Sequence, residues 1–117
     1  MITGTCHCGA VSYVFDDTPK RATSCNCSVC RRLGALWIYA KLPLITVNGP
    51  TFGHARGEKS LAFHSCRICG CTTHWENLNP TEPDAYMAVN LRLADPDVAA
   101  AIPVRHFDGA ETWTFLD

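Results

Sequence analysis

Cysteine is the residue type with the most scope for chemistry in this 117-residue chain, which contains eight of them. They fall into three tight groups: Cys6 and Cys8; Cys25, Cys27 and Cys30; and Cys66, Cys69 and Cys71. Disulfide frameworks usually spread cysteines along the chain to close long loops, whereas metal sites need thiolates in close pairs. The spacing therefore favours metal binding over disulfide bonds, although the even number of cysteines leaves four disulfides as an alternative.

Two pairs of cysteines have the spacing of a closed zinc site. Zinc prefers a tetrahedron of ligands at about 2.3 Å from sulfur, which places neighbouring sulfurs about 3.8 Å apart. We expect Cys6 and Cys8 to lie on an extended strand, where alternate side chains share one face. Cys66 and Cys69, followed by Gly70, have the form of a tight metal-binding turn. Joined, the two pairs complete a four-cysteine site that stabilises the fold and does no chemistry.

The middle group differs because it supplies three thiolates within six residues and needs a fourth ligand from elsewhere. Three protein ligands with one open position are typical of a catalytic zinc site, so Cys25, Cys27 and Cys30 are the candidate catalytic residues. Arg31 and Arg32 follow directly, and they are candidates to offset thiolate charge or to bind a substrate carboxylate.

Cys71 and two histidines leave alternatives open. Cys71 lies two residues after Cys69, so it is either a small buried core residue or a ligand or gating residue that points towards either group. If Cys71 or a histidine closed the middle group, that group would be structural. His64 and His74 flank the last cysteine group, and either is a candidate to hydrogen-bond a thiolate.

Most of the large aromatic residues are expected in the hydrophobic core. These residues are Trp37, Tyr39, Phe63, Trp75, Trp113 and Phe115. Trp37 and Trp75 are also near enough to the cysteine groups to line a pocket. We expect His106, in the C-terminal tail, to be a hydrogen-bonded core histidine.

Length and charge exclude several classes of protein. The chain fits a single zinc-binding domain over residues 1–117. A net charge of -1 argues against a protein that binds a nucleic-acid phosphate backbone. No apolar run approaches the roughly 20 residues that span a bilayer, and the N-terminus lacks the pattern of a secretory signal. We therefore expect a cytoplasmic protein whose partners include neither nucleic acid nor membrane.

Short apolar runs separated by Gly and Pro predict a mainly β fold with one or two short helices. Strands are predicted at residues 10–15, 35–42, 44–47, 61–65, 72–76 and 86–93, and helical turns at residues 28–33. A better-defined helix follows Asp95, which can cap it, has Pro96 at its first position and ends before Pro103. The tail over residues 104–116 is predicted to return to the sheet.

Three sequence blocks carry the cysteines: residues 4–11 (GTCHCGAV), 25–32 (CNCSVCRR) and 63–71 (FHSCRICGC). Two later blocks follow at residues 89–92 (VNLR) and 106–109 (HFDG). In this order they resemble the glutathione-dependent formaldehyde-activating enzyme family, which also includes the centromere protein V domain. The resemblance covers nearly the whole chain.

The resemblance implies an Mss4-like fold, a zinc-stapled set of β-sheets. It also implies a structural zinc on Cys6, Cys8, Cys66 and Cys69, and a second, labile zinc on Cys25, Cys27 and Cys30. The family's named activity is the condensation of glutathione with formaldehyde to S-hydroxymethylglutathione, which is classed as a carbon–sulfur lyase reaction.

We therefore predict a zinc-dependent carbon–sulfur lyase-like enzyme that condenses a thiol such as glutathione with formaldehyde or another small aldehyde. The alternative is a non-catalytic Mss4-like zinc module that binds a protein partner, and a fourth protein ligand at the middle group would favour it. A thiol–disulfide protein that uses Cys27 and Cys30 would need a βαβ scaffold, which this strand-rich pattern lacks. The sequence leaves the oligomeric state open.

Overall fold

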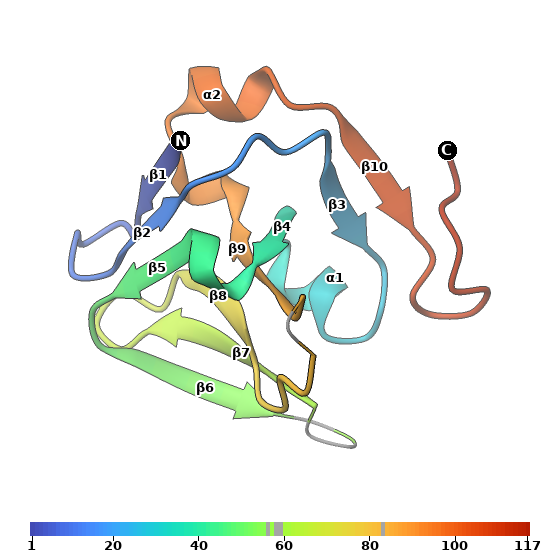
Figure 1. The fold of residues 1–117 in the computed structure, drawn as a ribbon, viewed down its shortest axis with the longest axis horizontal. Coiled ribbons are helices and arrows are strands. Elements are labelled where there is room, and N and C mark those ends of the chain that lie inside the picture. The colour runs from blue at the N-terminus through green and yellow to red at the C-terminus, as the bar shows by residue number, and fades with distance from the viewer. Residues whose placement is uncertain (56, 58–59, 83) are drawn as a thin grey trace.

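The computed structural model describes residues 1–55, 57, 60–82 and 84–117, and within them the chain forms a small and a large β-sheet (Figure 1). The small sheet is antiparallel, in the order β1 (Ile2–Thr5), β2 (Ser12–Phe15) and β5 (Ile45–Asn48). The large sheet has the order β10 (Val104–Phe107), β3 (Ala22–Cys25), β4 (Trp37–Lys41), β9 (Tyr86–Asn90), β8 (Thr72–Asn77), β7 (Leu61–Cys66) and β6 (Thr51–Ala55). Its neighbouring strands are antiparallel, except that β10 runs parallel to β3.

Short helical segments connect the strands. They are α1 (Cys30–Leu33), α2 (Pro96–Ala100) and two 3₁₀ turns, η1 (Leu42–Leu44) and η2 (Leu91–Leu93). The α2 helix begins as predicted, with the Asp97 amide donating to Asp95 Oδ1 at 2.9 Å. No helix in the described part of the chain is long and apolar enough to cross a membrane.

The predicted mainly β class with one or two short helices is confirmed. Strands β2, β4, β5, β7, β8 and β9 lie where the sequence predicted strands, and β10 returns the tail to the large sheet. Strands β1, β3 and β6 were not predicted, because their sequences ITGT, ATSC and TFGHA carry little apolar alternation. These strands depend on pairing with their neighbours, a contribution that local patterning does not reveal.

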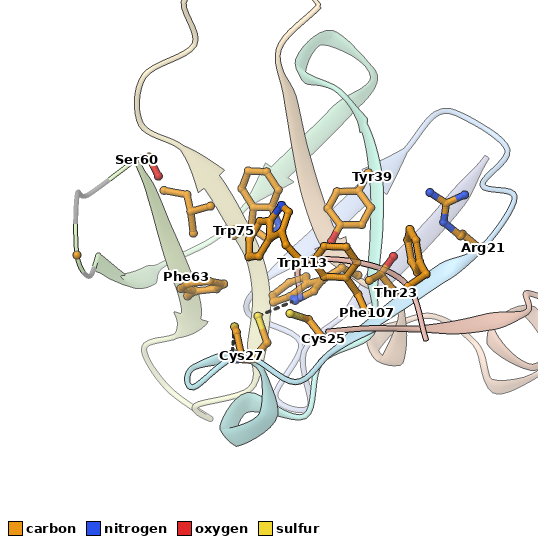
Figure 2. A pocket seen from close by; sticks show the side chains of 15 residues that line it. Arg21, Thr23, Cys25, Cys27, Tyr39, Ser60, Phe63, Trp75, Phe107 and Trp113 are labelled. Atoms are coloured by element: carbon orange, nitrogen blue, oxygen red, sulfur yellow. Dashed lines mark hydrogen bonds between the residues drawn. The ribbon is translucent and has the colours of Figure 1, made fainter. Parts of the chain in front are cut away.

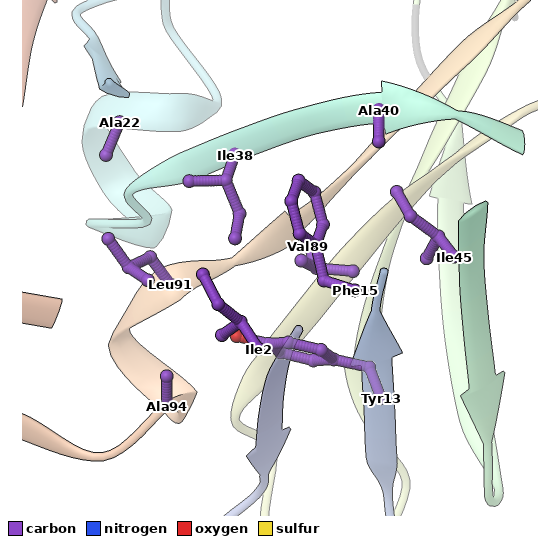
Figure 3. Packing of buried hydrophobic residues seen from close by; sticks show 10 residues of the cluster. All are labelled: Ile2, Tyr13, Phe15, Ala22, Ile38, Ala40, Ile45, Val89, Leu91 and Ala94. Carbon is purple, nitrogen blue, oxygen red and sulfur yellow. The ribbon is translucent and has the colours of Figure 1, made fainter. Parts of the chain in front are cut away.

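The main hydrophobic core lies between the small sheet and strands β4 and β9 (Figure 3). Phe15, Ile38 and Val89 are completely buried there, and each such side chain stabilises the fold by about 1.5–3 kcal/mol. The Tyr13 hydroxyl donates to the Asn90 carbonyl at 3.0 Å and ties the two layers together. Because strand side chains alternate, the face of β4 opposite this core is free to build a site.

Candidate functional site

Four of the predicted metal-binding cysteines converge beside the ends of β1 and β7. The sulfurs of Cys6, Cys8, Cys66 and Cys69, which we call the first group, all lie within 4.8 Å of one another. Cys8 Sγ lies 3.6 Å from Cys6 Sγ and 3.6 Å from Cys66 Sγ. These separations are close to the roughly 3.8 Å expected between ligands of a tetrahedral zinc ion. The first group therefore has the ligand number and spacing of a closed zinc site.

Both halves of the first group are formed by tight turns. Cys6 and Cys8 lie on a turn and not on the predicted strand, because the Gly9 amide donates back to the Cys6 carbonyl at 3.0 Å. Gly9 has a φ of 81°, in the left-handed region that glycine tolerates. The predicted turn at the other pair is present: Gly70 has a φ of 79°, and its amide donates to the Cys66 carbonyl at 2.9 Å.

Backbone amides around the first group favour the thiolate form. The Ile68 and Cys69 amides donate to Cys66 Sγ at 3.3 and 3.5 Å. Amide hydrogen bonds from Cys71 and Cys8 lower the pKa of Cys69 to about 5. Since zinc binds the deprotonated thiol, these donors prepare the group for a metal ion.

Three cysteines form a second group at the connection between β3 and α1. Cys25 ends β3, Cys30 begins α1 and Cys27 lies between them, with the three sulfurs within 4.8 Å of one another. The Cys30 amide donates to Cys27 Sγ at 3.4 Å, and Trp37 Nε1 donates to Cys30 Sγ at 3.4 Å. Among the described residues, no fourth Cys, His, Asp or Glu joins this group.

The thiols of the second group differ in acidity. Burial raises the pKa of Cys30, with a further increase from its neighbouring cysteines. Burial also acts to raise the pKa of Cys27, but hydrogen bonds from the Cys30 amide and from neighbouring groups outweigh it and lower that pKa. A cation is therefore needed to hold all three side chains as thiolates at neutral pH.

Cys71 belongs to neither group of converging sulfurs. Its half-buried side chain packs beside Cys6 and Cys66, so of the two sites left open by the sequence it lies near the first. All eight cysteines are in the described part of the chain, and none of them forms a disulfide bond.

His64 and His74 contact each other and polar neighbours. Their rings stack with centroids 4.4 Å apart. The two ring nitrogens of His64 lie 2.9 Å from Thr51 Oγ1 and 2.9 Å from Glu76 Oε1, while His74 Nδ1 lies 2.8 Å from Thr73 Oγ1. Burial, together with the charge of His64, lowers the pKa of His74 to about 4. Neither histidine belongs to a described cysteine group.

The second group lies at one end of a cavity of about 710 Å³ (Figure 2). The aromatic residues that line it are Trp37, Tyr39, Phe63, Trp75, Phe107, Trp113 and Phe115. All six aromatic residues expected in the core are in this set, yet Trp113 is 72% exposed and only Trp37, at 1%, is fully buried. The expectation of a core position is therefore wrong for Tyr39 and Trp113, which are exposed, whereas Phe63 and Trp75 pack against the buried cluster that contains Trp37. The predicted role of Trp37 and Trp75 in lining a pocket is confirmed, and the space is large enough for a ligand.

Among the described residues, the basic side chain that lines this cavity is Arg21, not Arg31 or Arg32. Arg31 and Arg32 are exposed and lie outside the described lining, and Arg32 Nη1 donates to the Ser28 carbonyl at 2.6 Å. The Arg21 guanidinium carbon lies 4.7 Å from the centroid of the Phe115 ring, away from the cysteines (Figure 2). Arg21 follows no cysteine in sequence, so only the fold reveals its position.

The C-terminal segment (residues 108–117) completes one side of the cavity. Asn26, which separates two cysteines of the second group, anchors this segment: Asn26 Nδ2 donates to Asp108 Oδ1 at 3.0 Å, and the Ala110 amide donates to Asn26 Oδ1 at 3.0 Å. Hydrogen bonds from Asn26 and Thr112 lower the pKa of Asp108, so its carboxylate is ionised at neutral pH. Asp108 lies in the HFDG block of the sequence, but its contact with Asn26, 82 positions earlier, is visible only in the fold.

Two further residues show how closely this segment approaches the second group. At Gly109, a Cβ would lie 2.6 Å from Cys25 Sγ, so a side chain there would collide with the group. His106 is exposed, and the prediction of a core position is wrong: its Nδ1 lies 2.7 Å from Asp117 Oδ2. This contact fastens the end of the chain to β10.

The donor sets of both groups suit zinc. Clustered thiolates are soft ligands of the kind that select zinc over harder cations. Each group is able to hold one metal ion, the first with four sulfurs and the second with three. The first set fits a closed structural site, and the second fits a site that keeps one position for another ligand.

Comparison with known proteins places this arrangement in a family. The family model for glutathione-dependent formaldehyde-activating enzyme matches residues 1–108. A crystal structure of a Rhodobacter sphaeroides protein is similar to this chain, with a TM-score of 0.70 and 29% sequence identity over 88% of this chain and 99% of that one. No curated protein matches the chain. Because the family match spans both cysteine groups, the chain belongs to the glutathione-dependent formaldehyde-activating enzyme family.

Proposed function

We propose that this protein binds zinc at both cysteine groups and that the second group condenses a thiol with a small aldehyde. In this proposal the first group holds a structural zinc, and Cys25, Cys27 and Cys30 hold a labile, catalytic one. The observation that carries the proposal is the position of the second group, whose three sulfurs lie at one end of a cavity without a fourth described ligand. Three protein ligands leave one position for a substrate.

The reaction is an addition that needs no oxidant or reductant. The thiol sulfur bonds to the aldehyde carbon, the carbonyl π bond breaks, and the thiol proton ends on the oxygen to give a hydroxyalkyl thioether. A zinc ion held by Cys25, Cys27 and Cys30 would bind the thiol sulfur directly and so favour its deprotonated form. Glutathione and formaldehyde are the substrate pair that the family's name supports.

Tyr39 is suited to stabilise the oxygen that gains charge. Its side chain lines the cavity from β4, and Figure 2 shows it above the cysteines. Although Tyr39 is 39% exposed, the desolvation of its ring by neighbouring side chains, with a further contribution from the negative charge of Cys30, raises its pKa to about 12. The hydroxyl therefore stays protonated at neutral pH and can donate a hydrogen bond to the developing alkoxide.

Two-dimensional NMR exchange between free and thiol-bound formaldehyde tests the proposal. We expect the wild-type protein to accelerate exchange above the spontaneous rate, and Cys27→Ser to abolish the acceleration. Cys71→Ser is the matched control because it changes a cysteine outside both groups, and we expect it to retain activity. If the zinc-loaded wild-type protein does not accelerate exchange with any small thiol, the lyase function is contradicted and a zinc module that binds a protein partner is favoured.

A further inference from the structure

The cavity beside the second group has two aromatic walls that come from different parts of the chain. The first wall belongs to β4, β7 and β8 of the large sheet. In it, the Trp37 and Phe63 rings lie 6.0 Å apart, and the Tyr39 and Trp75 rings lie 6.0 Å apart edge to face. Aromatic pairs at these separations form rigid surfaces that favour contact with another ring.

The second wall belongs to β10 and the C-terminal segment. Phe107 lies 5.1 Å from Trp113 and 5.1 Å from Phe115, edge to face in both pairs. Trp113 has a φ of 58°, which is uncommon for a residue other than glycine, and it stays 72% exposed. A large apolar side chain held in a strained conformation at a cavity is placed to contact a ligand rather than to fill the core.

The described part of the lining is mainly aromatic and carries little charge, which suits an aromatic ligand better than glutathione. Apart from the cysteines, Arg21 is the one charged side chain among the lining residues that the structure describes. Glutathione carries two carboxylates and one ammonium group at neutral pH. The described lining offers a single cation for the two carboxylates and no acidic side chain for the ammonium. Charged groups buried among aromatic rings without partners lose hydration that is not replaced.

We propose that the cavity selects a thiol that carries an aromatic ring and a single carboxylate, in preference to glutathione. The proposal rests on the proposed function, which places the thiol sulfur at the second group. The ring then lies between the two walls, and the carboxylate lies beside Arg21 at the far side of the cavity. A cavity of about 710 Å³ is within the usual range for ligands of this size.

Most of the second wall lies outside the family match. The family model covers residues 1–108, whereas Trp113 and Phe115 come later in the chain. Membership of the family therefore does not define this part of the cavity. Trp113 and Phe115 are specificity-determining residues that act on the ligand's ring.

Isothermal titration calorimetry on the zinc-loaded full chain tests the ligand class. The two thiols compared are para-(mercaptomethyl)benzoate and glutathione, and their thiol-free counterparts are para-toluate and S-methylglutathione, which test the walls without a sulfur–metal bond. We expect the aromatic thiol to bind at least about tenfold more tightly than glutathione, and para-toluate to bind more tightly than S-methylglutathione. The chain's three tryptophans all line the cavity, so their fluorescence gives a second binding signal.

Variants of the second wall test which residues are responsible. Trp113→Ala is expected to weaken both aromatic probes about tenfold, since ring stacking is lost. Phe52→Ala is the matched control, because Phe52 is an exposed aromatic residue on β6 outside the described lining, and we expect no change. Arg21→Gln is expected to weaken para-toluate about threefold and to leave neutral benzyl mercaptan unaffected.

The outcomes separate this inference from the proposed function. If glutathione binds as tightly as the aromatic thiol, or if Trp113→Ala leaves both aromatic probes unaffected, the inference is overturned while a lyase activity with glutathione can still stand. If the aromatic probes bind as expected but no thiol accelerates aldehyde exchange, the ligand class is supported and the lyase function is overturned.

Discussion

The two cysteine groups gather sulfur ligands in opposite ways. The first joins segments that are far apart in sequence, since Cys66 lies 58 positions after Cys8, and it packs with Val11 in a small core of its own. The second takes its sulfurs from residues 25–30 and borders a cavity. Bringing distant segments together costs chain entropy, which a bound metal ion offsets, whereas a local cluster closes no long loop. If the proposed function holds, separation along the chain distinguishes the ligand set that stabilises the fold from the one that is available for chemistry.

The largest expected effect is the loss of the fold when the first group is broken. In Cys66→Ser, we expect the domain to be unfolded or insoluble, because a structural zinc site contributes on the order of 10 kcal/mol and a small domain has little more stability than that. Circular dichroism and one-dimensional NMR measure the outcome. Cys71→Ser, at a half-buried cysteine outside both groups, is expected to stay folded. A folded Cys66→Ser protein would show that the first group is not structural.

Breaking the second group is expected to remove chemistry and leave the fold. Cys27→Ser should retain the circular dichroism spectrum of the wild type and bind one zinc per chain instead of two, with no aldehyde exchange. Mild chelation of the wild type should likewise remove zinc in two steps, measured by metal analysis against folded fraction. If both ions are lost together with the fold, the second group is structural and the contrast between the groups disappears.

Acid sensitivity should come partly from His74, which lies buried on β8. The pKa of His74 is lowered by burial to about 4 from its ordinary 6.5, so between these values the unfolded chain binds a proton that the folded chain does not. Stability is therefore complete above pH 6.5 and falls as the pH drops towards 4, by about 3 kcal/mol in all.

Urea unfolding at fixed zinc concentration, repeated between pH 7 and 5, measures this slope. Acid also protonates the thiolate ligands. The informative quantity is therefore the difference in the pH dependence of the unfolding free energy between the wild type and His74→Gln, which lacks the contribution of His74. We expect the variant to have the shallower slope. Identical slopes would assign all the acid sensitivity to the cysteines.

The smallest expected effects come from two glycines, one beside each group. Gly109→Ala places a Cβ 2.6 Å from Cys25 Sγ, so zinc affinity at the second group should fall about tenfold as the sulfur moves. Gly70→Ala meets no atom within 4 Å but forces alanine to a φ of 79°, which costs about 1 kcal/mol of stability. Zinc competition titrations and urea unfolding should show each defect separately. A fall in second-group affinity in Gly70→Ala would contradict this separation.

The cysteine groups could be predicted from the sequence because their spacing is a local property. Cys25, Cys27 and Cys30 converge within six residues, and the Gly70 turn brings Cys66 and Cys69 together. The backbone of the Cys6 pair could not be predicted in the same way. A strand and a glycine-closed turn both bring alternate sulfurs together, and the positive φ of Gly9 decides between them.

The cavity was the part that the sequence could not predict. A buried aromatic residue and one that lines a ligand site have the same apolar pattern, so Trp113 and Phe115 resembled core residues. Their position depends on the parallel pairing of β10 with β3, in which Phe107 lies opposite Cys25. Such pairing joins residues more than 80 positions apart, and local patterning contains no information about it.

The C-terminal segment is held at both ends, so its middle can vary without loss of its attachment to the cavity. The segment is fixed at its start by Asn26 and Asp108 and at its end by the contacts of Asp117 with Arg105 and His106. Residues 109–116 lie between these two attachment points. Apart from Gly109, their side chains can be replaced without changing a sulfur ligand. A graft of this stretch from another member of the family would transfer a ligand preference onto an intact metal centre. With the proposed function, mutations that alter recognition and mutations that destroy catalysis are therefore expected to fall on separate parts of one short chain.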